Sequence, residues 1–183
     1  MNVSEILKKY EQNTKVAQIN QLLLERKKVA VSGLLGSSLS IIIQTLFKKS
    51  ELPFLLVFND KEEAAYYLND LEQLLNDQDV LFYPGSYRRP YQIEETDNAN
   101  VLLRAEVLNR INSRKKPAII VSYTEALFEK VVTRKELDKN TLKLSVNDNL
   151  SIDFINETLF EYNFKRVDFV VEPGEFSVRG GII

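Results

Sequence analysis

The sequence predicts an α/β fold with a mostly parallel sheet flanked by helices, followed by the start of a smaller α+β domain with an antiparallel hairpin. Between residues 29 and 132, short apolar runs alternate with longer amphipathic segments, which is typical of strands joined by crossover helices in a parallel sheet. After Lys139 the sequence alternates apolar and polar residues and contains a Pro-Gly turn, which favours antiparallel structure. We expect the first domain to cover residues 1–135 and the second to cover 141–183.

The elements of the first domain follow in order from the spacing of apolar residues. Residues 3–24 predict two helical pieces that are interrupted around Asn13. Further strands are expected at 29–32, 54–58, 80–83 and 118–122, and helices at 37–49, 61–75, 97–112 and 125–132. The run FLLVF at 54–58 is apolar throughout and so predicts a fully buried strand. Asp60 and Glu63 form the pattern of a capping box at the start of the next helix.

The second domain begins after a polar boundary at 133–140. Leu142–Val146 predicts a half-exposed strand, and Ser151 is placed to cap a helix that reaches Tyr162. Residues 164–183 predict a hairpin with a Pro-Gly turn. The chain ends on Gly-Gly-Ile-Ile, which reads as an unpaired apolar strand, and we therefore expect a fragment that is truncated at its C-terminus.

The composition of the chain limits the classes of function. The chain has 183 residues, of which 44% are hydrophobic and 27% charged, as in a globular protein. It has no Cys and no His, which excludes thiol nucleophiles, Ser-His-Asp triads and zinc sites built on these residues. No catalytic residue and no metal site are expected. The net charge of −2 is unlike the basic charge of most nucleic-acid-binding modules. No apolar run approaches the ~20 residues of a membrane span, and we expect a cytoplasmic protein without a membrane partner.

The segment GLLGSSLS at 33–40 resembles a phosphate-binding loop, whose pattern is G-x-x-x-x-G-K-[ST]. Gly33 occupies the first glycine position, Gly36 adds a second glycine, and Ser40 occupies the final hydroxyl position. Ser38 replaces the second glycine of the pattern and Leu39 replaces the lysine, which removes the charge that neutralises the phosphates. We therefore predict a strand-to-helix turn without a bound nucleotide or other cofactor.

The predicted hairpin carries the candidate partner-binding residues. If Pro173 and Gly174 form a two-residue turn, Asp168 pairs with Arg179, and Arg166 lies opposite Gly181. These four residues, Arg166, Asp168, Arg179 and Gly181, then share one exposed face, while apolar pairs form the other. Two interpretations remain at this point: an exposed cross-strand ion pair, worth roughly 0–1 kcal/mol, or an interface with a partner protein.

The loop at 84–95, PGSYRRPYQIEE, is a second candidate surface. Arg88 and Arg89 lie between two tyrosines, an arrangement that suits stacking with nucleic acid bases. Acidic residues at 94–97 follow at once and cancel the local charge. Contact with DNA and packing against another domain of a parent protein both remain as interpretations, and we favour the second.

Residues 164–183, FKRVDFVVEPGEFSVRGGII, strongly resemble the second domain of bacterial transcription-repair coupling factors, the Mfd family. They are similar, less closely, to the excision-repair helicase UvrB. The resemblance implies a helicase-like domain of the RecA/P-loop type, UvrB-like domain 1a, followed by domain 2. UvrB keeps a working phosphate loop, so the missing lysine at Leu39 favours the Mfd family. The resemblance is most specific at 162–183 and diffuse elsewhere.

The resemblance also implies a function. Mfd finds RNA polymerase stalled at DNA damage, displaces it with a separate ATP-driven motor and recruits UvrA, which its UvrB-like module contacts. Arginines at the positions of Arg166 and Arg179 are implicated in that contact, whereas Ser177 stands where UvrB has another arginine.

The expected function is thus a protein-interaction module without ATPase activity of its own. UvrA is the expected partner. Contact with the parent protein's C-terminal domain is a further expectation, and RNA polymerase and DNA would bind through absent downstream domains. An active UvrB-type helicase fragment and a DNA-binding domain are the alternatives.

Overall fold

The computed structural model describes residues 2–75, 79–87, 97–113 and 116–183. The chain divides into two compact units, the first formed by residues 1–85 and 103–129 and the second by 86–102 and 130–183. Each unit is described by itself. The domain limits expected from the sequence, 1–135 and 141–183, stay a prediction.

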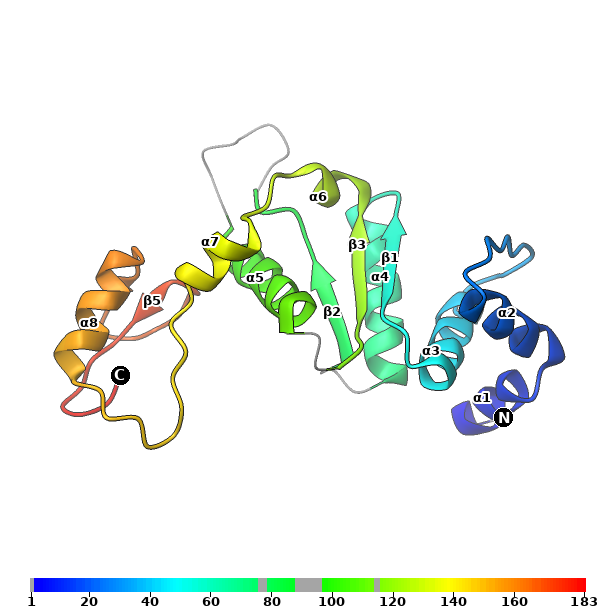
Figure 1. Cartoon of the computed structure of the whole chain (residues 1–183), viewed down its shortest axis with the longest axis horizontal. Helices are drawn as coiled ribbons and strands as arrows, with labels where there is room; N and C mark the ends of the chain where they lie inside the picture. The colour runs from blue at the N-terminus through cyan, green and yellow to red at the C-terminus, as the bar shows by residue number, and fades with distance from the viewer. Residues whose placement is uncertain (1, 76–78, 88–96, 114–115) are drawn as a thin grey trace. The chain divides into compact units, whose positions relative to one another are not determined.

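A parallel sheet forms the centre of the first unit (Figure 1). It contains β1 (Phe54–Phe58), β3 (Ile119–Tyr123) and β2 (Val80–Tyr83) in that spatial order. β3 pairs with both neighbours, so that Val121 lies beside Leu56 on one side and Phe82 on the other. All residues of β3 are buried. The parallel α/β arrangement predicted from the sequence is confirmed, whereas a RecA-type helicase fold stays a prediction.

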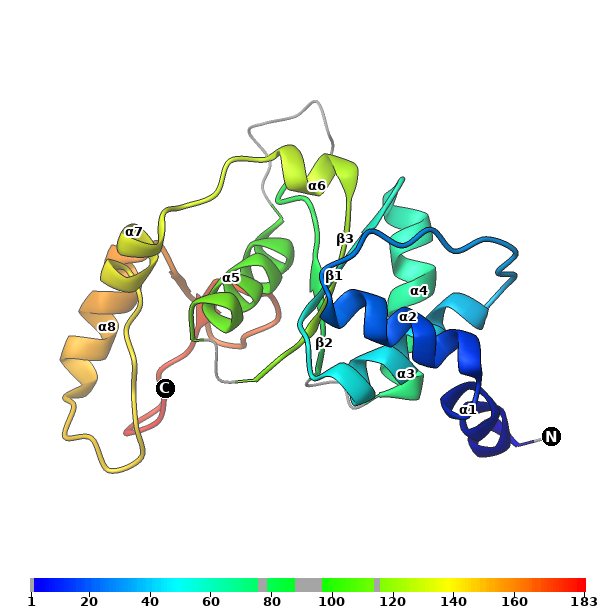
Figure 2. The same ribbon diagram turned by 45° about the vertical axis from the view of Figure 1, so that its right-hand side comes forward.

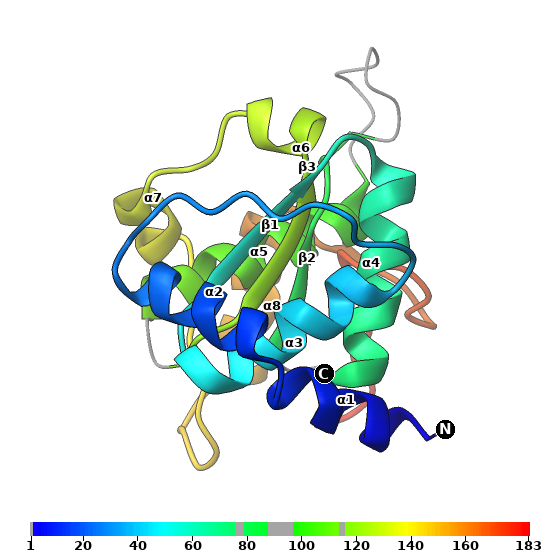
Figure 3. The same ribbon diagram turned by 90° about the vertical axis from the view of Figure 1, so that its right-hand side faces the viewer.

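Helices cover both faces of this sheet. The helices α3 (Ser38–Ser50) and α4 (Lys61–Leu74) pack on one face, where Phe47 and Leu71 join Val121 in the main core. The helix α5 (Asn98–Ser113) packs on the other face, where Val107 meets Leu81 and Ile120. Figures 2 and 3 show the sheet between α4 and α5. Asp60 accepts a hydrogen bond from the Glu63 amide at 2.7 Å, which confirms the predicted cap of α4.

Two short helices precede the sheet. The helices α1 (Val3–Glu11) and α2 (Thr14–Leu24) are separated at Asn13, whose side chain caps α2 by accepting from the amides of Lys15 and Val16. Val16 is buried against Ile42 and Leu46 of α3, which explains why α2 lies along that helix (Figure 3). The predicted interruption of the N-terminal helical segment is confirmed.

Two strand predictions in the first unit are wrong in part or in full. Val29–Ser32 is not a strand, because no strand of the described residues pairs with it and Val31 is 46% exposed. β1 is a strand as predicted but is not fully buried. Leu55 is 56% and Val57 48% exposed, because β1 is the edge of the sheet and only its α3/α4 face is covered. The last helix is α6 (Thr124–Phe128), shorter than the predicted 125–132.

The second unit contains α7 (Arg134–Lys139), α8 (Ile152–Glu161), β4 (Lys165–Arg166) and β5 (Glu175–Phe176). Ser151 caps α8 by accepting from the Phe154 amide at 3.1 Å, as predicted. Residues 142–146 do not form the predicted strand. None of the helices that the structure describes has both the length and the apolar character of a membrane span.

The predicted antiparallel hairpin is also wrong, because β4 and β5 are parallel. Lys165 pairs with Glu175 and Arg166 with Phe176, through bonds from the Lys165 amide to the Gly174 carbonyl and from the Val167 amide to the Phe176 carbonyl. Parallel pairing requires the chain to travel back before β5 begins. Residues 167–174 make that return, so a two-residue turn cannot set the register.

Candidate functional site

The segment at 33–40 is closed on itself. Gly33 and Gly36 have φ values of +79° and +52°, a backbone conformation that suits glycine. The Ser38 hydroxyl accepts from the Leu35 amide at 2.8 Å and donates to the Leu35 carbonyl at 2.7 Å. A Cβ at either glycine would meet nothing within 4 Å. The glycines are therefore required by the turn and not by close contact with a neighbouring group.

Ser40, the residue at the magnesium-binding position of the pattern, already has a hydrogen-bond partner within the protein. It is 1% exposed and its hydroxyl donates to a carboxylate oxygen of Asp70 at 3.1 Å. Leu39 packs against the main core, where a lysine of a working loop would need solvent or phosphate. The described residues contain no group of three or more Asp or Glu side chains that would hold a metal ion.

The strongest polar cluster of the first unit was missed by the sequence prediction. Arg104 is 7% exposed, donates to the carbonyls of Pro84 and Ala126 at 2.7 and 3.1 Å, and lies 3.4 Å from a Glu129 carboxylate oxygen. Its guanidinium carbon is 4.2 Å from the centroid of the Tyr83 ring. Arg104 shares the apolar side of α5 with Val107, and a charge in such a position signals a buried partner.

A buried tyrosine completes this cluster. The Tyr123 hydroxyl accepts from the Gly85 amide at 2.9 Å, and burial raises the pKa values of Tyr123 and Tyr83. A Cβ at Gly85 would lie 2.9 Å from a Glu129 carboxylate oxygen and 3.2 Å from the Tyr123 hydroxyl, so a larger residue would require the Glu129 side chain to move. The cluster joins the segments that follow β2 and β3, and its hydrogen bonds hold them together.

The second unit brings three of the four candidate partner-binding residues together. Arg166, Asp168 and Arg179 line a cavity of about 370 Å³, which Ser177 also lines. Gly181 is not part of it. Gly181 lies in a tight turn closed by reciprocal backbone bonds between Arg179 and Ile182 at 3.0 and 3.2 Å.

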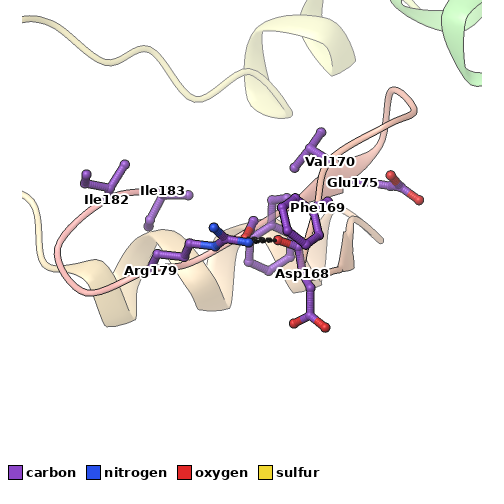
Figure 4. Close-up of a pocket in the computed structure, with 9 residues that line it drawn as sticks. Asp168, Phe169, Val170, Glu175, Arg179, Ile182 and Ile183 are labelled. Carbon is purple, nitrogen blue, oxygen red and sulfur yellow. Dashed lines mark hydrogen bonds between the residues drawn. The ribbon is translucent and has the colours of Figure 1, made fainter.

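Arg179 is held by the backbone of Asp168 and not by its carboxylate. The Arg179 guanidinium donates to the Asp168 carbonyl at 2.9 Å, and the Ser177 hydroxyl donates to the same oxygen at 3.1 Å. Figure 4 shows the Asp168 carboxylate pointing away from the guanidinium. The ion pair considered from the sequence is therefore not formed.

Glu175 shapes the turn before β5. One oxygen of its carboxylate accepts from the amides of Val171 and Glu172, both at 3.0 Å. These two hydrogen bonds lower the pKa of Glu175 below its ordinary value. The prediction of a two-residue Pro173-Gly174 turn did not foresee that the Glu175 side chain organises the turn itself.

The second predicted surface cannot be compared with the structure. Arg88 and Arg89 lie outside the described residues. Contact of the loop at 84–95 with DNA and its packing against another domain of a parent protein therefore both remain interpretations.

Comparisons with known proteins bear on the family. The family model of the UvrB interaction domain matches residues 142–183. The transcription-repair-coupling factor of Bacillus subtilis (strain 168) is 29% identical over 166 residues, which are 90% of this chain and 14% of that protein. The factor of Rickettsia bellii (strain RML369-C) is 29% identical over 142 residues, 77% of this chain and 13% of that protein. The chain thus spans about one seventh of the length of these relatives. The resemblance seen in the sequence is confirmed: the chain is similar to transcription-repair-coupling factors over most of its length, and residues 142–183 match the UvrB interaction domain.

Proposed function

We propose that this chain is the UvrA-binding module of a transcription-coupled DNA repair factor and that it recruits UvrA to RNA polymerase stalled at damage. One observation carries the proposal. Arg166 and Arg179, the two positions that the resemblance associates with UvrA, line a single cavity within the segment that matches the UvrB interaction domain.

The charges of this cavity favour an acidic partner. Arg166 and Arg179 are both exposed, and no carboxylate of the described residues lies within ion-pair distance of either one. A planar guanidinium forms two parallel hydrogen bonds with a carboxylate. β4 and the turn at 179–182 fix the two backbones before a partner arrives, which reduces the entropy lost on binding.

The same proposal assigns no ATPase activity to this chain. Ser40 is bound to Asp70, and the partly buried Leu39 packs against the core, which supports a loop without nucleotide chemistry. In the whole protein, the ATP-driven motor and the contacts with RNA polymerase and DNA belong to other segments. A contact with the parent protein's C-terminal domain is part of the proposal but rests on the resemblance alone.

Charge reversal of the cavity tests the proposal. We expect the double variant Arg166→Glu with Arg179→Glu to bind UvrA at least about 100-fold more weakly in calorimetry, since loss of one member of a buried interfacial charge pair costs roughly 2–5 kcal/mol. The matched control is Lys135→Glu with Lys143→Glu, which makes the same charge change at exposed sites of the second unit. Equal binding by both double variants, or no binding by the wild-type chain, would refute the proposed function.

A further inference from the structure

An apolar cavity lies next to the polar one in the second unit. Its volume is about 450 Å³, and the residues that line it are Asp168, Phe169, Val170, Glu175, Phe176, Ser177, Arg179, Ile182 and Ile183. Phe176 is buried at 5% exposure and packs edge-on against Phe160 of α8, with ring centroids 5.3 Å apart. Phe176 is therefore a buried apolar side chain among the residues that line the cavity.

The rim of this cavity is apolar and exposed. Phe169 is 74% exposed and Val170 55%. Single apolar residues on a surface need no explanation, whereas contiguous exposed ones beside a cavity are typical of interaction sites. An aromatic side chain offers a large contact area at low entropic cost, which is why such residues are enriched at binding hot spots.

Arg179 joins the two cavities. It lines both of them, together with Asp168 and Ser177. Its guanidinium carbon lies 4.5 Å from the centroid of the Phe169 ring, and one nitrogen donates to the Asp168 carbonyl. The ring attracts the cation and restricts its plane. The single hydrogen bond leaves the other N–H groups of the guanidinium available to an acceptor.

We propose that the partner of this surface inserts a large aliphatic or aromatic side chain into the apolar cavity, and that a carboxylate next to it in the same segment binds Arg179. The proposal rests on the proposed function, since UvrA is the partner that it describes. Phe169 acts twice in this arrangement: it contacts the inserted side chain and it holds the guanidinium in position. The exposed Arg179 at the edge of the apolar cavity favours a partner segment that carries an acidic residue over a segment that is only apolar.

Substitution of Phe169 separates this inference from the proposed function. We expect Phe169→Ala to weaken UvrA binding at least tenfold, and this effect should change less with salt concentration than the effect of Arg166→Ala, because salt screens charges and not apolar contacts. The matched control, Val171→Ala, changes an equally exposed apolar residue of the same loop that does not line the cavity, and it should bind as the wild type does. Melting temperatures of all variants should agree, because Phe169 is exposed.

The outcomes are distinct. If Arg166→Ala weakens binding and Phe169→Ala does not, the apolar contact is overturned and the proposed function stands. If neither variant affects UvrA binding, the proposed function fails as well. The variants Phe169→Leu and Arg179→Lys, alone and combined, test whether the ring positions the guanidinium. If the fold-loss of UvrA affinity in the double variant equals the product of the two single fold-losses, the two residues act independently and Phe169 does not position Arg179.

A cross-linking experiment tests the chemistry of the partner. A photoreactive phenylalanine analogue at position 169 should cross-link to an apolar residue of UvrA with an Asp or Glu within about two positions. The same analogue at position 171 serves as the control and should give little product. Cross-linking mainly to a second copy of this chain, or to a UvrA segment without acidic residues, would overturn the inference.

Discussion

Glu175 shows how one side chain fixes the geometry of a candidate interface. Its carboxylate binds two backbone amides, and the turn that results delivers the chain into β5. β5 in turn pairs with β4, which carries Arg166. The hydrogen-bonded form is the charged form, which is the reason that the pKa of Glu175 is lowered.

The stabilising effect of Glu175 should therefore depend on pH. A carboxyl group whose pKa in the folded state lies below its ordinary value, 4.5 for this group, stabilises the folded state above that pH, and the stabilisation is lost as the pH falls through the folded pKa. We expect Glu175→Gln to speed exchange of the Val171 and Glu172 amides at pH 7. The difference between the variant and the wild type should shrink as the pH falls below 4.5 and the Glu175 carboxylate becomes protonated, as measured by NMR hydrogen exchange. A difference that persists undiminished at pH 3 would contradict this role.

Arg104 is a second residue whose effect is predicted from its contacts. Removing it leaves the carbonyls of Pro84 and Ala126 without this donor and removes the guanidinium 3.4 Å from a Glu129 carboxylate oxygen. We expect Arg104→Met to reduce the free energy of unfolding of the first unit by about 3 kcal/mol, as measured by urea denaturation. Lys48→Met, at an exposed site of α3, should change it by less than about 0.5 kcal/mol. Similar effects of the two changes would show that the buried cluster contributes little.

At the scale of elements, β1 shows that a strand made only of apolar residues can be buried on one face alone. Every residue of the strand is apolar, yet Leu55 and Val57 face away from α3 and α4 and are about half exposed. Leu56 packs against the main core. The alternation arises because α5 covers the second face of β2 and β3 but leaves that face of β1 exposed, and the sequence of the strand does not contain this information.

Neighbouring substitutions in β1 should thus have opposite outcomes. Leu56→Ala is expected to lower the free energy of unfolding by about 2 kcal/mol, because it opens a cavity in the core. Leu55→Thr keeps the strand propensity and should change stability by less than about 0.5 kcal/mol, while it reduces self-association measured by light scattering. Equal destabilisation by the two changes would show that both faces of β1 are covered in solution.

The same contrast explains what the sequence could and could not predict. The helices α3 and α4 were placed within a residue or two, because caps and apolar spacing are local signals. The predicted strands at 29–32 and 142–146 are absent, since a strand requires a partner that no local pattern supplies. In the candidate site, Arg166 and Arg179 were singled out both by an antiparallel hairpin pairing, which the structure does not form, and by the resemblance to a family. The contacts of Arg104 and Glu175 depend on segments distant in sequence or on turn geometry, and sequence reasoning missed them.

For the molecule as a whole, the chain should not hydrolyse ATP. The loop at 33–40 has Leu39 in place of the lysine, and the hydroxyl of Ser40, at the final position of the pattern, is bound to Asp70. Leu39→Lys alone is expected to give no turnover above background in a phosphate-release assay, because it leaves Ser40 with the same partner. The wild-type chain should also give no heat of ATP binding in calorimetry. Hydrolysis that disappears in Ser40→Ala would contradict the prediction.

The bond between Ser40 and Asp70 also has a consequence for evolution. Restoring a nucleotide site would require changes at Ser38, Leu39 and the Ser40–Asp70 pair, and each of these side chains now stabilises the fold. A lysine at Leu39 would lose core packing before it had a phosphate to neutralise. Each single substitution towards the phosphate-loop pattern is expected to cost stability and to yield no nucleotide binding, so selection would remove variants that carry only one of them. A lineage with this packing would therefore tend to keep a loop that has Leu39 in place of the lysine and Ser40 bound to Asp70.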